Sequence, residues 1–226
     1  GISYLSYLLK RYVFHESGTL VSGIIGGLYS STATISVLAR KSRKASEQEA
    51  TDYVAAMLLA VSMMFLRFMI LILIFSREIF LSIYPYLLTM AVVAAIVAWF
   101  IHSRQKRPED QPAETEEDDS SNPLEFKVAL IFAVLFVIFT FLTHYTLGTG
   151  GLNLLSFVSG FSDITPFILN LLQNTGSVAA LIITACSMQA IISNIMVNMF
   201  YALFFAGKGS KLRPWILGGF GAVIAC

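Results

Sequence analysis

Long tracts of this chain contain almost no charged residue, and this distribution constrains the fold more than any single motif. Seven of the fourteen acidic residues fall between positions 109 and 119, inside one polar stretch. Overall, 56% of the residues are hydrophobic and 13% are charged, whereas soluble domains carry about 25% charged residues. Apolar tracts of about 20 residues are long enough to cross a bilayer as helices. The sequence therefore predicts an all-α integral membrane protein.

The apolar tracts predict a series of membrane segments. They comprise a truncated helix at 2–14 and segments A (17–39), B (50–75), C (79–102), D (124–147), E (148–173), F (175–205) and G (212–226). Residues 103–123 are charged, contain proline and lack apolar periodicity, which predicts a disordered linker. We therefore expect a first membrane repeat at 1–102 and a second at 124–226. No signal peptide is recognisable, and the first and last segments are too short for a full span.

The chain is weakly similar to itself. One overlay of the sequence on itself places segment A on segment E, with Gly27 on Gly160. A second overlay, in a slightly different register, places segment B on segment F, with Ala60 on Ala185. Internal repeats of this kind are common in membrane transporters. The sequence therefore predicts two pseudo-symmetric helical repeats.

The basic residues favour an inverted relation between the repeats. If every segment spans, each repeat has four crossings and the copies are parallel; if A and E are broken or re-entrant, each has three and the copies are inverted. Cytoplasmic loops collect lysine and arginine. The first arrangement divides the fourteen basic residues outside the spans eight to six, and the second divides them thirteen to one, with Arg77 alone. We therefore expect inverted repeats with the basic loops and linker in the cytoplasm, although segment A is long enough to cross.

Two formal charges lie well inside apolar segments, Arg67 in segment B and Asp163 in segment E. A charge at that depth costs about 2.5 to 3.5 kcal/mol on insertion scales and is a sign of function. Residues 163–166 (DITP) also have the pattern of a helix start, with aspartate as N-cap and proline in the first turn. A helix that starts halfway through a hydrophobic segment is typical of transporter sites. The alternative is a structural ion pair that fastens segment B to segment E.

Segment A contains a glycine pair followed by a run of hydroxyl residues. Its small residues recur at intervals of four, which suits close packing between helices. Packing accounts for the glycines but not for the density of hydroxyl groups, which could instead line a polar pocket. We predict a mid-membrane site for a small ion or solute at the breaks in segments A and E. Its candidate residues are Asp163, Ser30, Ser31, Thr32, Thr34, Thr165, Arg67, Gln189, Asn194 and Asn198.

The residue types leave the sign of the ligand open. An aspartate with hydroxyl and amide oxygens suits a hard cation or a proton, and we expect this class. An arginine beside two half-helix N-termini would suit an anion. The two cysteines and three histidines have no metal-ligand arrangement, and no nucleotide-binding loop or nucleophile triad is present. We therefore expect no enzyme activity, no cofactor and no nucleic acid, and we leave a homo-oligomer open.

Two motifs carry a family resemblance. The runs GLYSSTAT at 27–34 and LAR at 38–40 resemble a signature of the bacterial membrane family designated domain of unknown function 4010. The run GFSDITP at 160–166 is similar to the second signature, but Thr165 and Pro166 stand where the family tends to have a further acid and alanine. This departure puts a two-carboxylate cation site in doubt. The resemblance extends from Leu5 to the C-terminus.

The resemblance implies a bacterial inner-membrane protein without a settled activity. Members usually follow an MgtC/SapB-type membrane domain, which implies a preceding domain of that kind and a loose association with magnesium and ion homeostasis. A transporter domain is the leading interpretation. The alternative is a non-transporting regulatory or assembly module of an MgtC-like protein.

Overall fold

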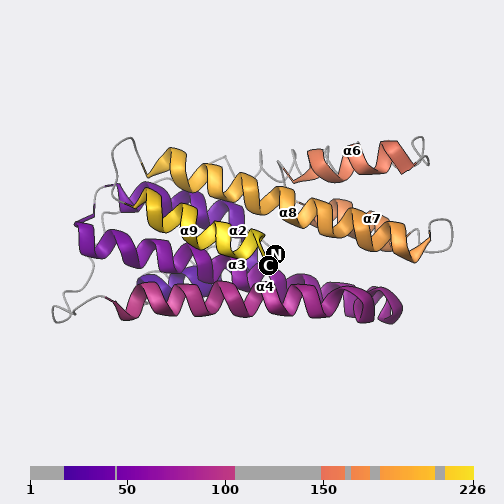
Figure 1. Cartoon of the computed structure of the whole chain (residues 1–226), viewed down its shortest axis with the longest axis horizontal. Helices are drawn as coiled ribbons and strands as arrows, with labels where there is room; N and C mark the ends of the chain where they lie inside the picture. Colours follow the sequence, from indigo (N-terminus) through magenta and orange to yellow (C-terminus); the bar gives the residue numbers. More distant parts are fainter. Residues whose placement is uncertain (1–17, 44, 105–148, 161–163, 174–178, 207–211) are drawn as a thin grey trace, which may run out of the picture.

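The computed structural model describes residues 18–43, 45–104, 149–160, 164–173, 179–206 and 212–226. These parts of the chain form helices and no strand (Figure 1). The helices are α2 (Thr19–Ser42), α3 (Glu47–Phe75), α4 (Arg77–Ser103), α6 (Thr149–Ser159), α7 (Thr165–Gln173), α8 (Ala180–Phe205) and α9 (Arg213–Ile224). The predicted all-α fold is confirmed for these ranges. The expected helix at 2–14, segment D and nearly all of the linker lie outside them.

The surface of the helices is suited to lipid. Four described helices, α2, α3, α4 and α8, are long and apolar enough to cross a membrane. Phe65, Phe68 and Ile83 are buried between helices, whereas Trp99 is 72% exposed and Phe204 is 68% exposed. Large apolar side chains exposed to this extent indicate a surface that contacts lipid rather than water. The chain is a polytopic helical membrane protein.

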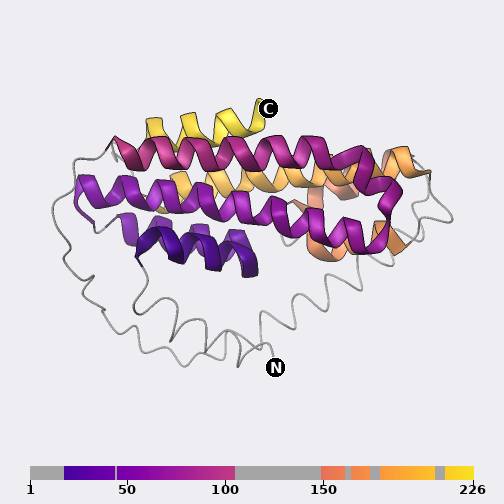
Figure 2. The same cartoon turned by 90° about the horizontal axis from the view of Figure 1, so that it is seen from below.

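Serine residues set the boundaries of α3 and α4. Ser46 caps α3, because its Oγ accepts a hydrogen bond from the Glu49 backbone N–H while the Glu49 carboxylate accepts one from the Ser46 N–H. Ser76 alone separates α3 from α4, and its Oγ accepts a hydrogen bond from the Ile79 N–H (3.4 Å). This one-residue joint makes the two helices antiparallel neighbours (Figure 2).

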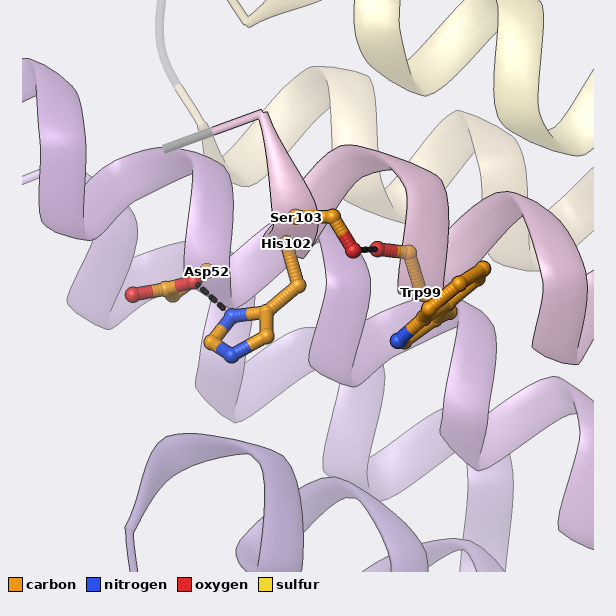
Figure 3. A network of polar contacts seen from close by, with 4 residues as sticks. All are labelled: Asp52, Trp99, His102 and Ser103. Carbon is orange, nitrogen blue, oxygen red and sulfur yellow. Dashed lines mark hydrogen bonds and ion pairs between the residues drawn. The ribbon is translucent and has the colours of Figure 1, made fainter. Parts of the chain in front are cut away.

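A polar contact joins α3 to α4 where α3 begins and α4 ends. His102 Nδ1 lies 2.8 Å from Asp52 Oδ1, and the two side chains are 33% and 30% exposed (Figure 3). In the same turn, Ser103 Oγ donates to the Trp99 carbonyl (2.7 Å), the bond to the preceding turn that serine side chains in helices often make. The contact of His102 with Asp52 fastens α3 to α4 near the ends of the two helices, away from the centre of the spans.

The α2 segment is broken at Ser30. This residue has φ −154° and ψ 107°, an extended backbone between helical residues on both sides. Its Oγ accepts a hydrogen bond from the Ala33 N–H (3.3 Å), which is the bond that an N-cap serine makes. Ser30 therefore ends one half-helix and caps the next, in agreement with the predicted break in segment A.

The two halves of α2 fold back on each other. A Cβ built on Gly26 would lie 2.5 Å from Thr34 Oγ1, whereas residues eight apart in a continuous helix are separated by about 12 Å. Residues 19–29 and 31–42 each span about 16 to 18 Å, roughly half of a hydrocarbon core. Both views show α2 beside one half of α3, with its two ends at the same end of the bundle (Figures 1 and 2). The α2 segment, here called the first hairpin, folds back on itself although its length and composition would let it span.

Glycines bring the first hairpin directly onto α3. A Cβ on Gly23 would overlap the Ala56 carbonyl, and one on Gly27 would lie 2.5 Å from Ala60 Cα. Because the atoms in the way belong to the backbone of α3, they cannot move aside as a side chain could. The spacing of four residues therefore has the packing role expected of small residues in membrane helices.

The α6 and α7 helices, here called the second hairpin, form another broken segment. The α6 helix ends at Ser159 and α7 begins at Thr165, with 161–163 outside the described residues. Figure 1 shows both helices beside the half of α8 that contains its N-terminus, whereas α2 lies toward the other end of the bundle. Segment E is thus interrupted where the sequence predicts, and the two broken segments approach the middle from opposite ends.

The described basic residues are distributed unequally between the two ends of the bundle. Arg77 lies at the end where α3 meets α4, and Arg67 lies within α3. The other five lie at the opposite end, near the ends of α2 and α4 and the start of α9: Arg40, Lys41, Arg43, Arg104 and Arg213. This division agrees with the re-entrant arrangement of segments A and E.

A disulfide can test the first hairpin. With Cys186 and Cys226 replaced by alanine, we expect Gly26→Cys combined with Thr34→Cys to cross-link under mild oxidation. An ideal Cβ on Gly26 lies 3.2 Å from Thr34 Cβ, close to the separation of about 3.8 Å in disulfides. The measurement is the mobility shift on a non-reducing gel.

The matched control is Gly18→Cys combined with Gly26→Cys. This pair is also eight residues apart, but both positions precede the break, so its Cα atoms should be about 12 Å apart and should not cross-link. Equal cross-linking of both pairs, or of neither, would contradict the hairpin.

Packing against α3 predicts the effect of a single methyl group. We expect Gly27→Ala to destabilise the protein by about 1 to 3 kcal/mol, because the added Cβ meets the backbone at Ala60. Gly221→Ala in α9 is the control, since nothing lies within 4 Å of its Cβ position, and it should leave the Tm in detergent unchanged or slightly raised. Similar Tm values for the two variants would argue against the close contact.

Candidate functional site

Arg67 joins the two hairpins near the middle of the bundle. Its Nη1 donates to the Tyr29 carbonyl in the first hairpin (2.6 Å), and its Nη2 donates to Thr165 Oγ1 at the start of α7 (3.2 Å). Arg67 lies on α3 about 12 Å before the helix ends at Phe75. Among the charged side chains of the described helices, it is the one far from both ends of the bundle. The predicted charge in segment B is therefore the contact point of the two broken segments.

The bond from Arg67 to Tyr29 follows from the break at Ser30. When the helix stops there, its last carbonyls lose their partners within the helix and carry the partial negative charge of a helix C-terminus. No water is available in a bilayer core, where an unsatisfied backbone group costs several kcal/mol, roughly. A guanidinium group has several donors in a fixed fork, so it can satisfy this carbonyl and reach a second acceptor. Arg67 thus stabilises the first break and connects it to the second hairpin.

The α8 helix satisfies the end of α6 in a similar way. Ser193 Oγ donates to the Phe157 carbonyl (2.8 Å), and Asn194 Nδ2 donates to the Gly160 carbonyl (3.1 Å). A Cβ on Gly160 would overlap the Ser193 side chain, so this approach of α6 to α8 requires glycine. At both breaks, side chains of the long helix that follows therefore satisfy the exposed carbonyls.

Each hairpin contacts its following long helix at the same sequence spacing. Gly27 lies against Ala60 and Gly160 lies against Ser193, and the two pairs are equally far apart in the sequence. An overlay of Gly27 on Gly160 therefore also places Ala60 on Ser193, whereas the sequence similarity of segments B and F places Ala60 on Ala185. The contacts thus favour the overlay of α3 on α8 that pairs Ala60 with Ser193 over the overlay that pairs Ala60 with Ala185. Ser193 is absent from the predicted site, and its sequence signal is that it follows Gly160 as Ala60 follows Gly27.

Two hydroxyl groups of the predicted site are used for packing. Ser31 is buried, and its Oγ lies 3.2 Å from Met64 Sδ on α3. The Thr34 side chain is buried against Gly26 inside the first hairpin. Both side chains thus stabilise the hairpin, which accords with the packing interpretation of the hydroxyl run.

The other two hydroxyl residues of the predicted site in this run, Ser30 and Thr32, lie at the break and two residues after it. Ser30 and Thr32 are half-buried, and Ser30 Oγ already caps the second half-helix. The Thr32 carbonyl accepts a hydrogen bond from Ser36 Oγ (2.8 Å). Of these two residues, Thr32 is the one whose hydroxyl makes no hydrogen bond among the described residues.

The three predicted amide residues of α8 do not share one face. Asn198 Nδ2 donates to Asn194 Oδ1 (3.1 Å), and both side chains are buried. Gln189 precedes Asn194 by five residues, a rotation of about 140° around the helix, and is half-buried. Asn194 therefore reaches the second break and is itself held by Asn198, whereas Gln189 lies on another face of α8.

The structure thus unites part of the predicted set. Arg67 and Thr165 are in direct contact, and the two asparagines are linked to each other and to Gly160. Asp163 lies outside the described residues. Within the described ranges, no three His, Cys, Asp or Glu residues form a group that could hold a metal ion. The polar groups assembled there are a guanidinium, hydroxyls, amides and the carbonyls of broken helices.

Comparisons with known proteins agree with the sequence motifs. The profile of the family described as Domain of unknown function (DUF4010) matches residues 1–206. An uncharacterized protein of Aquifex aeolicus (strain VF5) is 26% identical over 203 residues, which cover 88% of this chain and 87% of that protein. No solved structure matched the chain.

The satisfied carbonyl at Gly160 predicts the effect of removing its donor. We expect Asn194→Leu to destabilise the protein by about 1 to 2 kcal/mol, because the Gly160 carbonyl and the Asn198 amide both lose a partner. The Tm in detergent measures this loss.

Gln189→Leu provides the control for that substitution. It makes a closely similar change of side chain on the same helix, at a half-buried position on another face, and should alter stability by less than about 0.5 kcal/mol. If Gln189→Leu were as destabilising as Asn194→Leu, the loss of stability could not be attributed to the bond between Asn194 and Gly160.

Proposed function

The chain belongs to the DUF4010 family, and we propose that it is a membrane transporter domain that binds a small ion or solute where its two hairpins meet. The observation that carries this proposal is the double contact of Arg67 with Tyr29 and Thr165. One charged side chain holds both broken segments at membrane depth. A purely structural helix bundle does not need such a charge, and intramembrane charges commonly mark transport pathways.

The arrangement of the hairpins supports transport. Broken helices that enter from opposite ends, within repeats of inverted topology, typically surround substrate sites near the middle of the membrane. The equal spacing of the Gly27–Ala60 and Gly160–Ser193 contacts supports such a repeat. Each hairpin would then separate the site from one side of the membrane, and movement of one hairpin at a time would give alternating access.

Arg67 would hold the closed arrangement in this scheme. Its two bonds join hairpins that must separate for a ligand to pass, so opening either side would break one bond and leave the other. Thr32 and Thr165 would offer neutral contacts at the tips, and Asp163 stays the predicted charge of the second break. An ion that competes for these groups would bind the open arrangement of the hairpins more tightly than the closed one. Its binding would therefore favour opening, because a ligand shifts a conformational equilibrium by its difference in affinity for the two states.

The distribution of basic residues supports an orientation. The five described basic residues at one end of the bundle would face the cytoplasm of a bacterial inner membrane, with Arg77 on the opposite side. The first hairpin would then enter from the cytoplasmic side and the second from the other side.

A second function, a regulatory or assembly module of an MgtC-like protein, is favoured by a different observation. Ser31 and Thr34 are buried in packing contacts within the first hairpin and against α3. In that case the lipid-exposed surface would bind a preceding MgtC-like membrane domain or another copy of the chain, and Arg67 would be a purely structural fastener.

Ion flux into proteoliposomes tests the transporter proposal. We expect uptake of one of H⁺, Na⁺, K⁺, Mg²⁺ or chloride above the level of empty liposomes, measured with ion-sensitive dyes. Arg67→Ala should lower this flux by about tenfold or more, because it removes a charged hydrogen bond from each hairpin. Thr165→Val, which removes one of the two bonds, should have a smaller effect.

Arg77→Ala is the matched control, since Arg77 is the first residue of α4 and lies at one end of the bundle, away from the hairpin tips. Flux unchanged by Arg67→Ala would contradict the role of the contact, and flux unchanged by Asp163→Asn would remove Asp163 from the site. The assembly module would be favoured if no ion gave flux and if cysteines substituted one at a time at positions 30–36 were all inaccessible to water-soluble thiol reagents.

A further inference from the structure

A chain of hydrogen bonds runs from the end of α6 into α8. Asn194 Nδ2 donates to the Gly160 carbonyl (3.1 Å), and Asn198 Nδ2 donates to Asn194 Oδ1 (3.1 Å). Asn198 is fully buried, with 0% of its surface exposed. Among the described residues, no donor reaches Asn198 Oδ1. The chain of bonds therefore ends in a buried amide oxygen.

The direction of this chain is determined by the backbone. A carbonyl can only accept, so Asn194 must present its NH₂ group to Gly160 and its oxygen to Asn198. Asn198 must in turn present its NH₂ group to Asn194. An exchange of oxygen and nitrogen in either side chain is excluded, because it would break at least one of these bonds. Asn198 Oδ1 is thus an acceptor that needs a donor or a cation.

The two breaks differ in the charge of the donors that bind their exposed carbonyls. At the first break, a half-helix C-terminus with its partial negative charge is in contact with a positive charge, the guanidinium of Arg67. At the second break, the end of α6 is bound by the neutral hydroxyl of Ser193 and the neutral amide of Asn194, and Asn194 Oδ1 in turn accepts a hydrogen bond from Asn198. The donor at the first break is thus a charged guanidinium, whereas Ser193 and Asn194 at the second break are neutral donors.

We propose that Asn198 Oδ1 is a ligand of a dehydrated monovalent cation of the Na⁺ class, held beside the C-terminus of α6. Amide and carbonyl oxygens at the ends of broken membrane helices are the ligands such cations use in transporters. The described groups are neutral, which suits a single charge, whereas a divalent ion prefers several carboxylates. Asn198 lies one turn beyond Asn194, toward the part of α8 beside which α2 packs, so the cation would lie between the hairpins.

This site deepens the proposed transport function by supplying the class of ion, either as the substrate or as the ion that drives transport. It also has a consequence that is independent of flux. A cation bound to the folded protein alone stabilises it in proportion to the logarithm of its concentration. Stability can therefore reveal the site even if the chain transports nothing.

The test compares the Tm of the full chain in detergent in NaCl, KCl and choline chloride at equal ionic strength. We expect Na⁺ at about one hundred times its Kd to raise the Tm by roughly 5 °C relative to choline, with a smaller rise in K⁺. Asn198→Leu should abolish the rise. Asn198→Ser, which can still donate to Asn194 Oδ1 through its hydroxyl, should fold and should raise the half-maximal Na⁺ concentration by about tenfold.

Ser187→Ala is the matched control. Its Oγ is also fully buried on α8 without a hydrogen-bond partner among the described residues, but it does not belong to the chain of bonds that starts at Gly160. The Na⁺-specific rise should persist in this variant. A rise equal in choline and Na⁺, no rise at all, or a rise unchanged in Asn198→Ser would each overturn the cation site. A Na⁺-dependent Tm without flux would support the cation site and refute the transporter. Flux without a Na⁺-dependent Tm would support the transporter and refute the cation site.

Discussion

Backbone carbonyls at the two helix breaks must find hydrogen-bond donors inside the protein, and the polar design of this bundle depends on that requirement. In water, the end of a helix is satisfied by solvent, but a bilayer core offers none. The long helix that follows each hairpin supplies the donors. Arg67 on α3 serves the first break, and Ser193 and Asn194 on α8 serve the second. Polar residues that look like defects in the apolar segments are therefore what allows the segments to be broken.

These bonds can form only because the backbones approach closely. Gly23, Gly27 and Gly160 each lie where a Cβ would collide with the neighbouring helix. Without a hydrophobic driving force between helices in lipid, such close contact is what holds a half-length helix in place. The hairpins need it most, because each half is too short to reach both membrane surfaces and must be fixed by its neighbour.

The same contacts bear on structure and on function. A break fully satisfied from one long helix would be a rigid feature. Arg67 differs, because its two bonds reach both hairpins and so make the position of one depend on the other. The second break differs again, since its donors are neutral and leave a buried oxygen at Asn198. This asymmetry between otherwise similar breaks is the basis of the cation site that we propose.

The sequence by itself determined the membrane class, the approximate limits of the described helices and the positions of both breaks. These properties are local: hydropathy over about 20 residues marks a span, and capping serines and glycines mark where a helix stops. It also identified Arg67, Thr165 and the two asparagines as unusual, because polar groups are costly at that depth. The basic residues also favoured a segment A that does not cross, but only the tertiary structure gave the contact of Gly26 with Thr34 by which α2 folds back. It alone decided that Ser31 and Thr34 serve packing, and that Gln189 lies apart while Ser193 takes part. The reason is that these facts depend on contacts between residues far apart in the sequence, such as Ser31 with Met64 and Arg67 with Thr165, which no local pattern specifies.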